Sequence, residues 1–84
     1  MGDHYPIHDL IENQRKRLGL RRSELAIRCG FKNISKGLRR IEGVCAGNLD
    51  SPGAKMVLTN LPVALEVEKD RVENAVLATR EVMP

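Results

Sequence analysis

The residues of this chain that could do chemistry are mainly basic, and they gather in one segment. Residues 15–40 hold ten Lys or Arg and one acid, Glu24, a net +9 inside a chain whose formal charge is only +3. Such a concentration of positive charge favours a polyanionic partner such as nucleic acid. The only aromatic residues are Tyr5 and Phe31, which argues against a platform that stacks unpaired bases. The basic segment therefore points to a polyanionic partner that is not bound through stacked single-stranded bases.

Other reactive side chains are too few, or badly spaced, for catalysis or metal binding. His4 and His8 could be combined with Cys29 and Cys45 into a zinc site, but Pro6 separates the histidines and both cysteines fall on inward helix positions. There is no glycine-rich phosphate loop and no Ser/His/Asp spacing of a hydrolase. We expect no enzyme, metal, cofactor or small-molecule ligand, since 84 helix-rich residues leave little room for a pocket.

Length and composition predict one small domain over residues 1–84. The apolar fraction of 42% and the charged fraction of 30% are those of a globular protein. No apolar run approaches the roughly 18 residues of a membrane span, and the N-terminus lacks the pattern of a signal peptide. Two cysteines do not make a disulfide scaffold. We therefore expect a cytoplasmic protein with no membrane partner.

Apolar residues recur with helical spacing nearly throughout, and no segment alternates as a strand would. The pattern predicts an all-α fold of five short helices, over residues 6–18, 22–29, 34–45, 52–61 and 69–82. Gly19 and Gly30 are expected to end the first two helices through left-handed backbone angles. Pro62 predicts a kink or break near Leu61, because proline cannot donate to the preceding turn.

The third predicted helix carries the candidate contact residues. Asn33 is the expected N-cap, with Ser35 as the alternative. The apolar stripe that should face the core consists of Ile34, Leu38, Ile41 and Cys45. Gly37 has two interpretations, a helix flaw tolerated by packing or a place where the backbone approaches DNA.

A set of residues between positions 18 and 43 matches a known pattern. It comprises Gly19-Leu20, Glu24-Leu25-Ala26, Gly30 four residues after the alanine, and Ile41-Glu42. The segment resembles the helix-turn-helix of the phage repressor/Cro-like (XRE-like) family. The resemblance implies a repressor-like domain, with the helix-turn-helix at about residues 21–45, that binds double-stranded DNA, usually as a homodimer. Two features depart from that pattern: about two extra residues before Leu38, and Arg22 where the family usually has a glutamine that contacts phosphate.

Two roles in DNA contact are assigned to the outward residues. Those near the start of the third helix should enter the major groove and read bases, and they are Asn33, Ser35, Lys36 and Arg39. Those expected to contact phosphate are Arg21, Arg22, Arg28, Lys32 and Arg40. Lys36 suits a phosphate as well as a base. If the extra turn residues rotate Arg39 onto a phosphate, Ser35 or Asn33 is left as the reader.

The function that these features predict is that of a sequence-specific transcriptional regulator of repressor type. The alternative is a helix-turn-helix fold that binds proteins and not DNA. RNA binding is a third interpretation, and the basic run as a merely solvated face is the fourth. Leu77 lies away from the apolar stripe of the last helix and, with Val82, is the candidate for a two-fold dimer contact; an isolated exposed leucine is the alternative.

Overall fold

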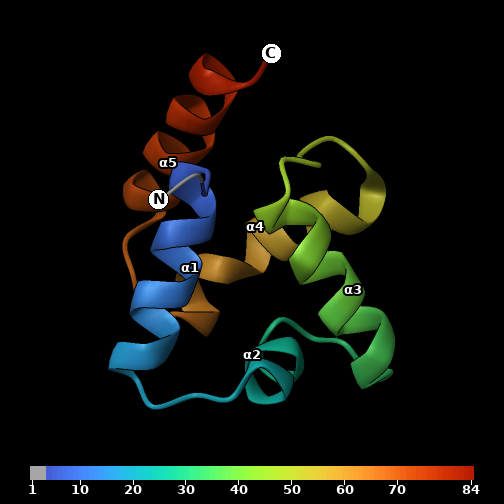
Figure 1. The fold of residues 1–84 in the computed structure, drawn as a ribbon. Coiled ribbons are helices and arrows are strands. Elements are labelled where there is room, and N and C mark those ends of the chain that lie inside the picture. Colours follow the sequence, from blue (N-terminus) through green and yellow to red (C-terminus); the bar gives the residue numbers. More distant parts are fainter. Residues whose placement is uncertain (1–3) are drawn as a thin grey trace.

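The computed structural model describes residues 4–84, so the first three residues of the predicted domain lie outside the description. Five helices follow one another, α1 (Pro6–Arg17), α2 (Arg22–Arg28), α3 (Ile34–Cys45), α4 (Pro52–Ala64) and α5 (Lys69–Val82) (Figure 1). The described residues contain no strand, and the predicted all-α fold is confirmed. None of their helices is long and apolar enough to cross a membrane.

Local residue chemistry explains most of the helix ends. Gly19 and Gly30 have φ angles of +69° and +92°, so both glycines turn the chain as expected. The side chains of Asn33 and Ser51 each accept a hydrogen bond, 3.1 Å long, from the backbone N–H three residues later. Asn33 is therefore the N-cap of α3, and the alternative cap Ser35 lies inside the helix.

Of the kink or break predicted near Leu61, the break is wrong. Helix α4 continues through Pro62 to Ala64, and the N–H of Leu65 still donates to the carbonyl of Leu61 at 2.8 Å. Pro62 lies in the last turn, so its missing N–H removes one helical bond and leaves little helix beyond it to redirect. The reversal comes later, at Glu66, which has a φ of +55° although it is not glycine.

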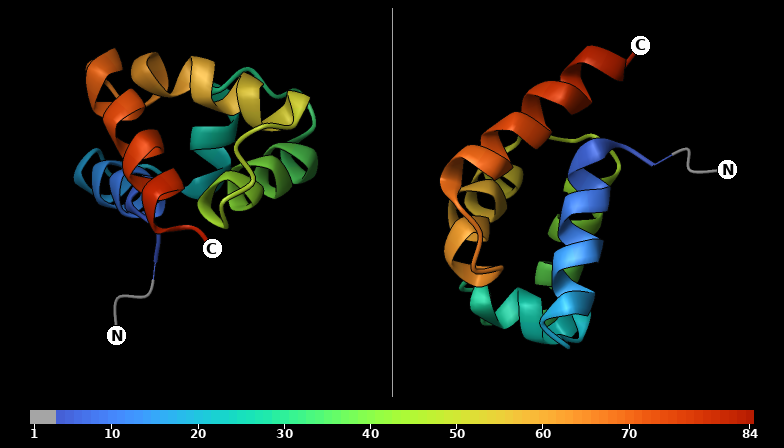
Figure 2. Two further views of the ribbon diagram at one scale, coloured as in Figure 1. Left: turned by 90° about the horizontal axis from the view of Figure 1, so that it is seen from above. Right: turned by 90° about the vertical axis from the view of Figure 1, so that its left-hand side faces the viewer.

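Helix α1 is held to the C-terminal half of the chain at both of its ends. The N–H of Ile7 donates to the buried Oγ1 of Thr79 on α5, at 3.0 Å. Near the other end of α1, the side-chain amide of Gln14 donates to the carbonyl of Leu65 at 3.0 Å. Helices α1 and α5 lie side by side, while α3 packs against both α2 and α4 (Figure 2). All five helices contribute to one core, whose fully buried larger side chains include Ile7, Ile11, Leu25, Val44, Val57, Leu61 and Leu65.

The inward face of α3 is rotated from the predicted stripe. The buried residues are Gly37, Ile41 and Val44, whereas Ile34, Leu38 and Cys45 are only half-buried. A Cβ on Gly37 would lie 2.9 Å from the Cβ of Ala26, closer than two carbons pack. Gly37 therefore lets α3 approach α2, and its predicted approach to DNA is excluded because the residue faces the core.

Candidate nucleic-acid interface

Three segments with basic residues lie along one edge of the molecule. The C-terminal end of α1, the whole of α2 and the N-terminal end of α3 follow one another along the lower edge of Figure 1, with α2 between the other two. The end of α5 lies at the opposite edge. The tertiary structure thus brings the basic segment, residues 15–40, to one part of the surface.

The crossing of α2 and α3 is closely packed, so the two helices have one relative orientation. Ala26 is fully buried, and Gly37 opposes both Ala26 and the side chain of Phe31. The N–H of Phe31 donates to the carbonyl of Ala26 at 3.2 Å, which ties the connection between the helices back to α2. A rigid crossing of this kind presents the outer side chains of α3 in a fixed direction.

Five of the nine predicted contact residues are exposed cations without an acidic partner. They are Arg21, Lys32, Lys36, Arg39 and Arg40. Among residues 4–84, no carboxylate oxygen lies within 4.0 Å of any of their side-chain nitrogens. Their charge is therefore not neutralised locally. Arg40 also packs its side chain over Gly53, at the start of α4, where a Cβ would lie 2.5 Å from its Cδ.

Arg22 and Arg28, both assigned to phosphate, are engaged within the chain. Nη2 of Arg22 lies 3.1 Å from Oε1 of Glu12, on α1. Nη1 of Arg28 donates to the carbonyl of Ala64 at 3.2 Å and to Glu66 Oε2 at 3.1 Å. Arg28 therefore joins α2 to the end of α4, and binding phosphate would compete with that bond.

The base-reading candidates lie in three positions, two on α3 and one at its N-cap. By the helical step of 100° per residue, Ser35 and Arg39 point away from the buried face and Glu42 continues the same line; we call these three the outer row. Lys36 lies to one side of this row and is exposed. Asn33 is exposed at the start of the helix, but its side-chain oxygen Oδ1 already accepts a hydrogen bond from the backbone N–H of Lys36.

Glu42 was not among the predicted site residues, although its spacing from Ser35 and Arg39 could have identified it. It is exposed, and it places a negative charge at the C-terminal end of the outer row. A carboxylate there repels phosphate, so only the N-terminal half of α3 suits a close approach to DNA.

The sequence also did not predict that Glu12 would be buried among basic residues. Its two oxygens accept hydrogen bonds from Nη2 and Nε of Arg15, at 2.9 and 3.0 Å. The hydrogen bond from Arg15, followed by that from Arg22, lowers the pKa of Glu12 to about 2, although burial acts in the opposite direction. Glu12 is therefore a carboxylate throughout the physiological pH range.

The cysteines and histidines do not form a reactive site in the described residues. Cys29 and Cys45 are free thiols, and burial raises the pKa of each to about 11. The rings of His4 and His8 stack with centroids 3.9 Å apart. Within residues 4–84, no group of three or more His, Cys, Asp or Glu side chains could hold a metal ion.

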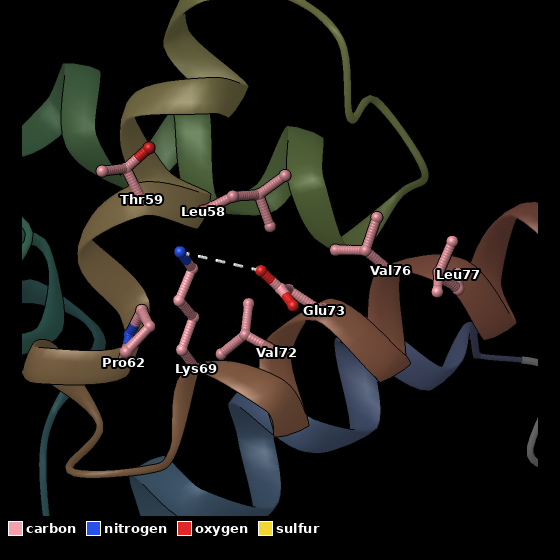
Figure 3. Close-up of a pocket in the computed structure, with 8 residues that line it drawn as sticks. All are labelled: Leu58, Thr59, Pro62, Lys69, Val72, Glu73, Val76 and Leu77. Carbon is pink, nitrogen blue, oxygen red and sulfur yellow. Dashed lines mark ion pairs between the residues drawn. The ribbon is translucent and has the colours of Figure 1, made fainter.

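A second surface feature, an apolar groove of about 680 Å³ between α4 and α5, was not expected from the sequence (Figure 3). We call it the α4–α5 groove. Leu77 lines it and is 58% exposed, whereas Val82 is exposed elsewhere on α5. Lys69 and Glu73 form an ion pair of 3.9 Å within it. Its lining residues are Leu58, Thr59, Pro62, Lys69, Val72, Glu73, Val76 and Leu77.

Comparison of the chain with models of protein families, with curated proteins and with solved structures gives no match.

Proposed function

We propose that this protein binds double-stranded DNA as a sequence-specific transcriptional regulator, with α2 and α3 acting as a helix-turn-helix. The observation that carries this proposal is the group of five exposed cations without acidic partners among residues 4–84, one just before α2, one in the turn after it and three on α3. An unneutralised basic surface on a rigid pair of helices suits the charge and the groove of a duplex.

The proposed contact places the N-terminal half of α3 in the major groove. Arg39 lies in the outer row, and its planar head can bond O6 and N7 of one guanine. Lys32 and Arg40 lie at the sides of this row, where they would meet phosphates. Glu42 favours an approach by the start of α3 and disfavours one along its whole length. Arg22 and Arg28 contribute less free charge than their number suggests, because acids already pair with them.

Selection of bound duplexes from a random pool tests the proposal and yields the binding site. On the selected duplex, Arg39→Ala should weaken specific binding by about 1–3 kcal/mol and relax the preference at one base pair. Non-specific binding should change far less. Arg71→Ala is the matched control, because Arg71 is an exposed arginine of α5 and its removal changes the net charge equally.

Two results would contradict this proposal. Equal losses of specific and non-specific affinity for Arg39→Ala would assign Arg39 to phosphate contact. No duplex affinity for the wild-type protein at low salt would reject DNA binding and favour the alternative, a module that binds another protein. The α4–α5 groove is the surface that such a protein partner would use.

We further propose that the regulator is a homodimer joined at the α4–α5 groove. Glu73, Val76, Leu77 and Arg80 share one face of α5 by their spacing. If two copies of α5 pair antiparallel about a point between Val76 and Leu77, Glu73 lies opposite Arg80 of the second copy. Arg80 binds its own Asp50 through Nη1 and Nη2, which leaves its Nε–H available. No residue of α2 or α3 lines the groove, so the DNA-binding face stays free.

A further inference from the structure

The junction of α1 and α2 contains an ion-pair network that reaches the proposed DNA-binding surface. Glu12 Oε1 accepts from Nη2 of Arg15 at 2.9 Å and from Nη2 of Arg22 at 3.1 Å, while Oε2 accepts from Nε of Arg15 at 3.0 Å. The Glu12 side chain is only 11% exposed. A buried carboxylate that loses its partners is strongly destabilised, so Glu12 is confined to this geometry.

Arg15 fixes the carboxylate relative to the connection between the helices. Its Nη1 donates to the carbonyl of Leu20 at 2.7 Å. Leu20 is buried and lies two residues before the first residue of α2, Arg22. The position of Glu12 is therefore tied to the start of α2 and not to α1 alone.

The guanidinium of Arg22 bonds Glu12 through only one of its three nitrogens. Its side chain is 61% exposed, and only Nη2 bonds Glu12. Nη1 and Nε are left for a second acceptor. An arginine that is already oriented loses less conformational entropy when it binds a phosphate than a freely rotating one.

We propose that Glu12 is a positioning residue that orients the guanidinium of Arg22 toward a DNA phosphate; the proposal rests on the proposed DNA binding. Arg21, the preceding residue, supplies a contrast. Its backbone N–H bonds Glu24, but its exposed side chain makes no bond within the described residues. Arg22 is thus an oriented phosphate contact, whereas Arg21 attracts DNA only by its charge.

The sign of one measurement separates positioning from plain electrostatics. Glu12→Gln removes a negative charge beside the basic surface, so electrostatics alone predicts tighter binding of any duplex. Loss of positioning predicts weaker binding, because Arg22 must then be ordered at the moment of contact. Glu81→Gln makes the same change of charge at the far end of α5, at an exposed residue that does not line the α4–α5 groove, and is the matched control.

The test is a double-mutant cycle on duplex affinity, measured at several salt concentrations with wild type, Glu12→Gln, Arg22→Ala and the double variant. We expect about a fivefold loss for Arg22→Ala, a loss of about threefold for Glu12→Gln, and little further loss when both are combined. The salt slope should fall by about one unit in each Arg22→Ala protein if Arg22 meets a phosphate.

Arg22→Lys covers the case in which Glu12→Gln does not fold, because it leaves Glu12 and Arg15 in place. Lysine lacks the planar guanidinium that bonds Glu12 along one edge and presents its other edges in a fixed direction, so this variant should bind nearly as weakly as Arg22→Ala. Wild-type affinity for Arg22→Lys would overturn the positioning role.

The outcomes distinguish the two proposals. Equal effects of Arg22→Ala with and without Glu12, in a protein that binds duplex, would overturn positioning and leave DNA binding intact. No duplex affinity in wild type would overturn both. Without DNA, ¹⁵N relaxation of the Arg22 Nε–H should report an ordered side chain that becomes mobile in Glu12→Gln, and a mobile Arg22 in wild type would overturn positioning directly.

Discussion

The contacts among α1, α2 and α3 differ in kind from those between α4 and α5. At the crossing of α2 and α3, a single methyl group on Gly37 would lie 2.9 Å from the Cβ of Ala26, whereas α4 and α5 leave a groove of about 680 Å³. The ion pairs differ likewise. The buried Glu12 carboxylate pairs with both Arg15 and Arg22. Lys69 and Glu73 are exposed, and Nζ of Lys69 lies 3.9 Å from Oε1 of Glu73.

The contacts among α1, α2 and α3 are therefore closely packed, whereas α4 and α5 leave apolar surface uncovered between them. Close packing fixes the direction of the outer row of α3, which is what reading a base edge requires. Open apolar surface leaves hydrophobic free energy to be gained on association with a partner. The following substitutions compare the packing of α1, α2 and α3 with that of α4 and α5.

The largest expected effect is on the stability at low pH of the ion-pair network that joins α1 to α2. The pKa of Glu12 is 4.5 in the unfolded chain and about 2 in the folded one, so its contribution is complete above pH 4.5 and is lost as the pH falls toward 2. The loss should be about 3 kcal/mol. Urea unfolding between pH 7 and pH 2 should show it, with Glu12→Gln reducing the dependence and Glu73→Gln leaving it in place. An identical pH profile for Glu12→Gln would contradict the buried network.

The second effect concerns added volume. Ala26→Leu inserts a larger side chain at the crossing of α2 and α3, where there is no free space, and should lower the free energy of unfolding by about 2–3 kcal/mol. Val76→Leu adds one methylene group beside the α4–α5 groove and should leave stability within about 0.5 kcal/mol. The check is denaturant unfolding of both variants, and equal losses would show that the two contacts are packed alike.

The third effect compares two glycines of one helix. Gly37→Ala gains helix propensity but forces a methyl group against Ala26 and Phe31, so we expect a net loss of about 1–2 kcal/mol. At Gly43 the nearest atoms to an added Cβ are 3.9 Å away, so Gly43→Ala should stabilise the protein by about 0.5–1 kcal/mol. Thermal melts decide the matter, and a stabilising Gly37→Ala would refute the close crossing.

The fourth effect is on self-association. Leu77→Ser removes apolar surface from the α4–α5 groove and should weaken the proposed dimer about tenfold, or roughly 1.4 kcal/mol. Val82→Ser is the control, because Val82 is 61% exposed on the same helix but does not line the groove. Sedimentation equilibrium measures both. A wild-type monomer at concentrations that saturate DNA would reject the dimer.

Much of the fold could be predicted because it depends on local residue chemistry. Gly19 and Gly30 turn the chain with positive φ angles, and Asn33 and Ser51 cap helices, since each acts within three or four residues of itself. The same local argument failed at Pro62, where the position of the proline in the last turn outweighed its general effect on helices.

The sequence predicted which residues make up the candidate site better than it predicted how those residues pair with one another. The basic residues and their outward positions followed from helical spacing, and the exposed cations lie where that spacing placed them. The spacing did not show that Glu12 and Glu66 pair with Arg22 and Arg28, because those partners come from α1 and from the end of α4. Pairing between distant segments depends on how the helices pack.

The sequence alone determined five helices, most of their ends and a concentrated positive charge, because each depends on residue types that act over a single helical turn. The tertiary structure decided which face of α3 is buried, because Gly37 can approach Ala26 only after α2 has been placed. It also decided that Arg22 and Arg28 pair with acids, and it left an apolar groove between α4 and α5. These features depend on distances between helices, which no periodicity in the chain encodes.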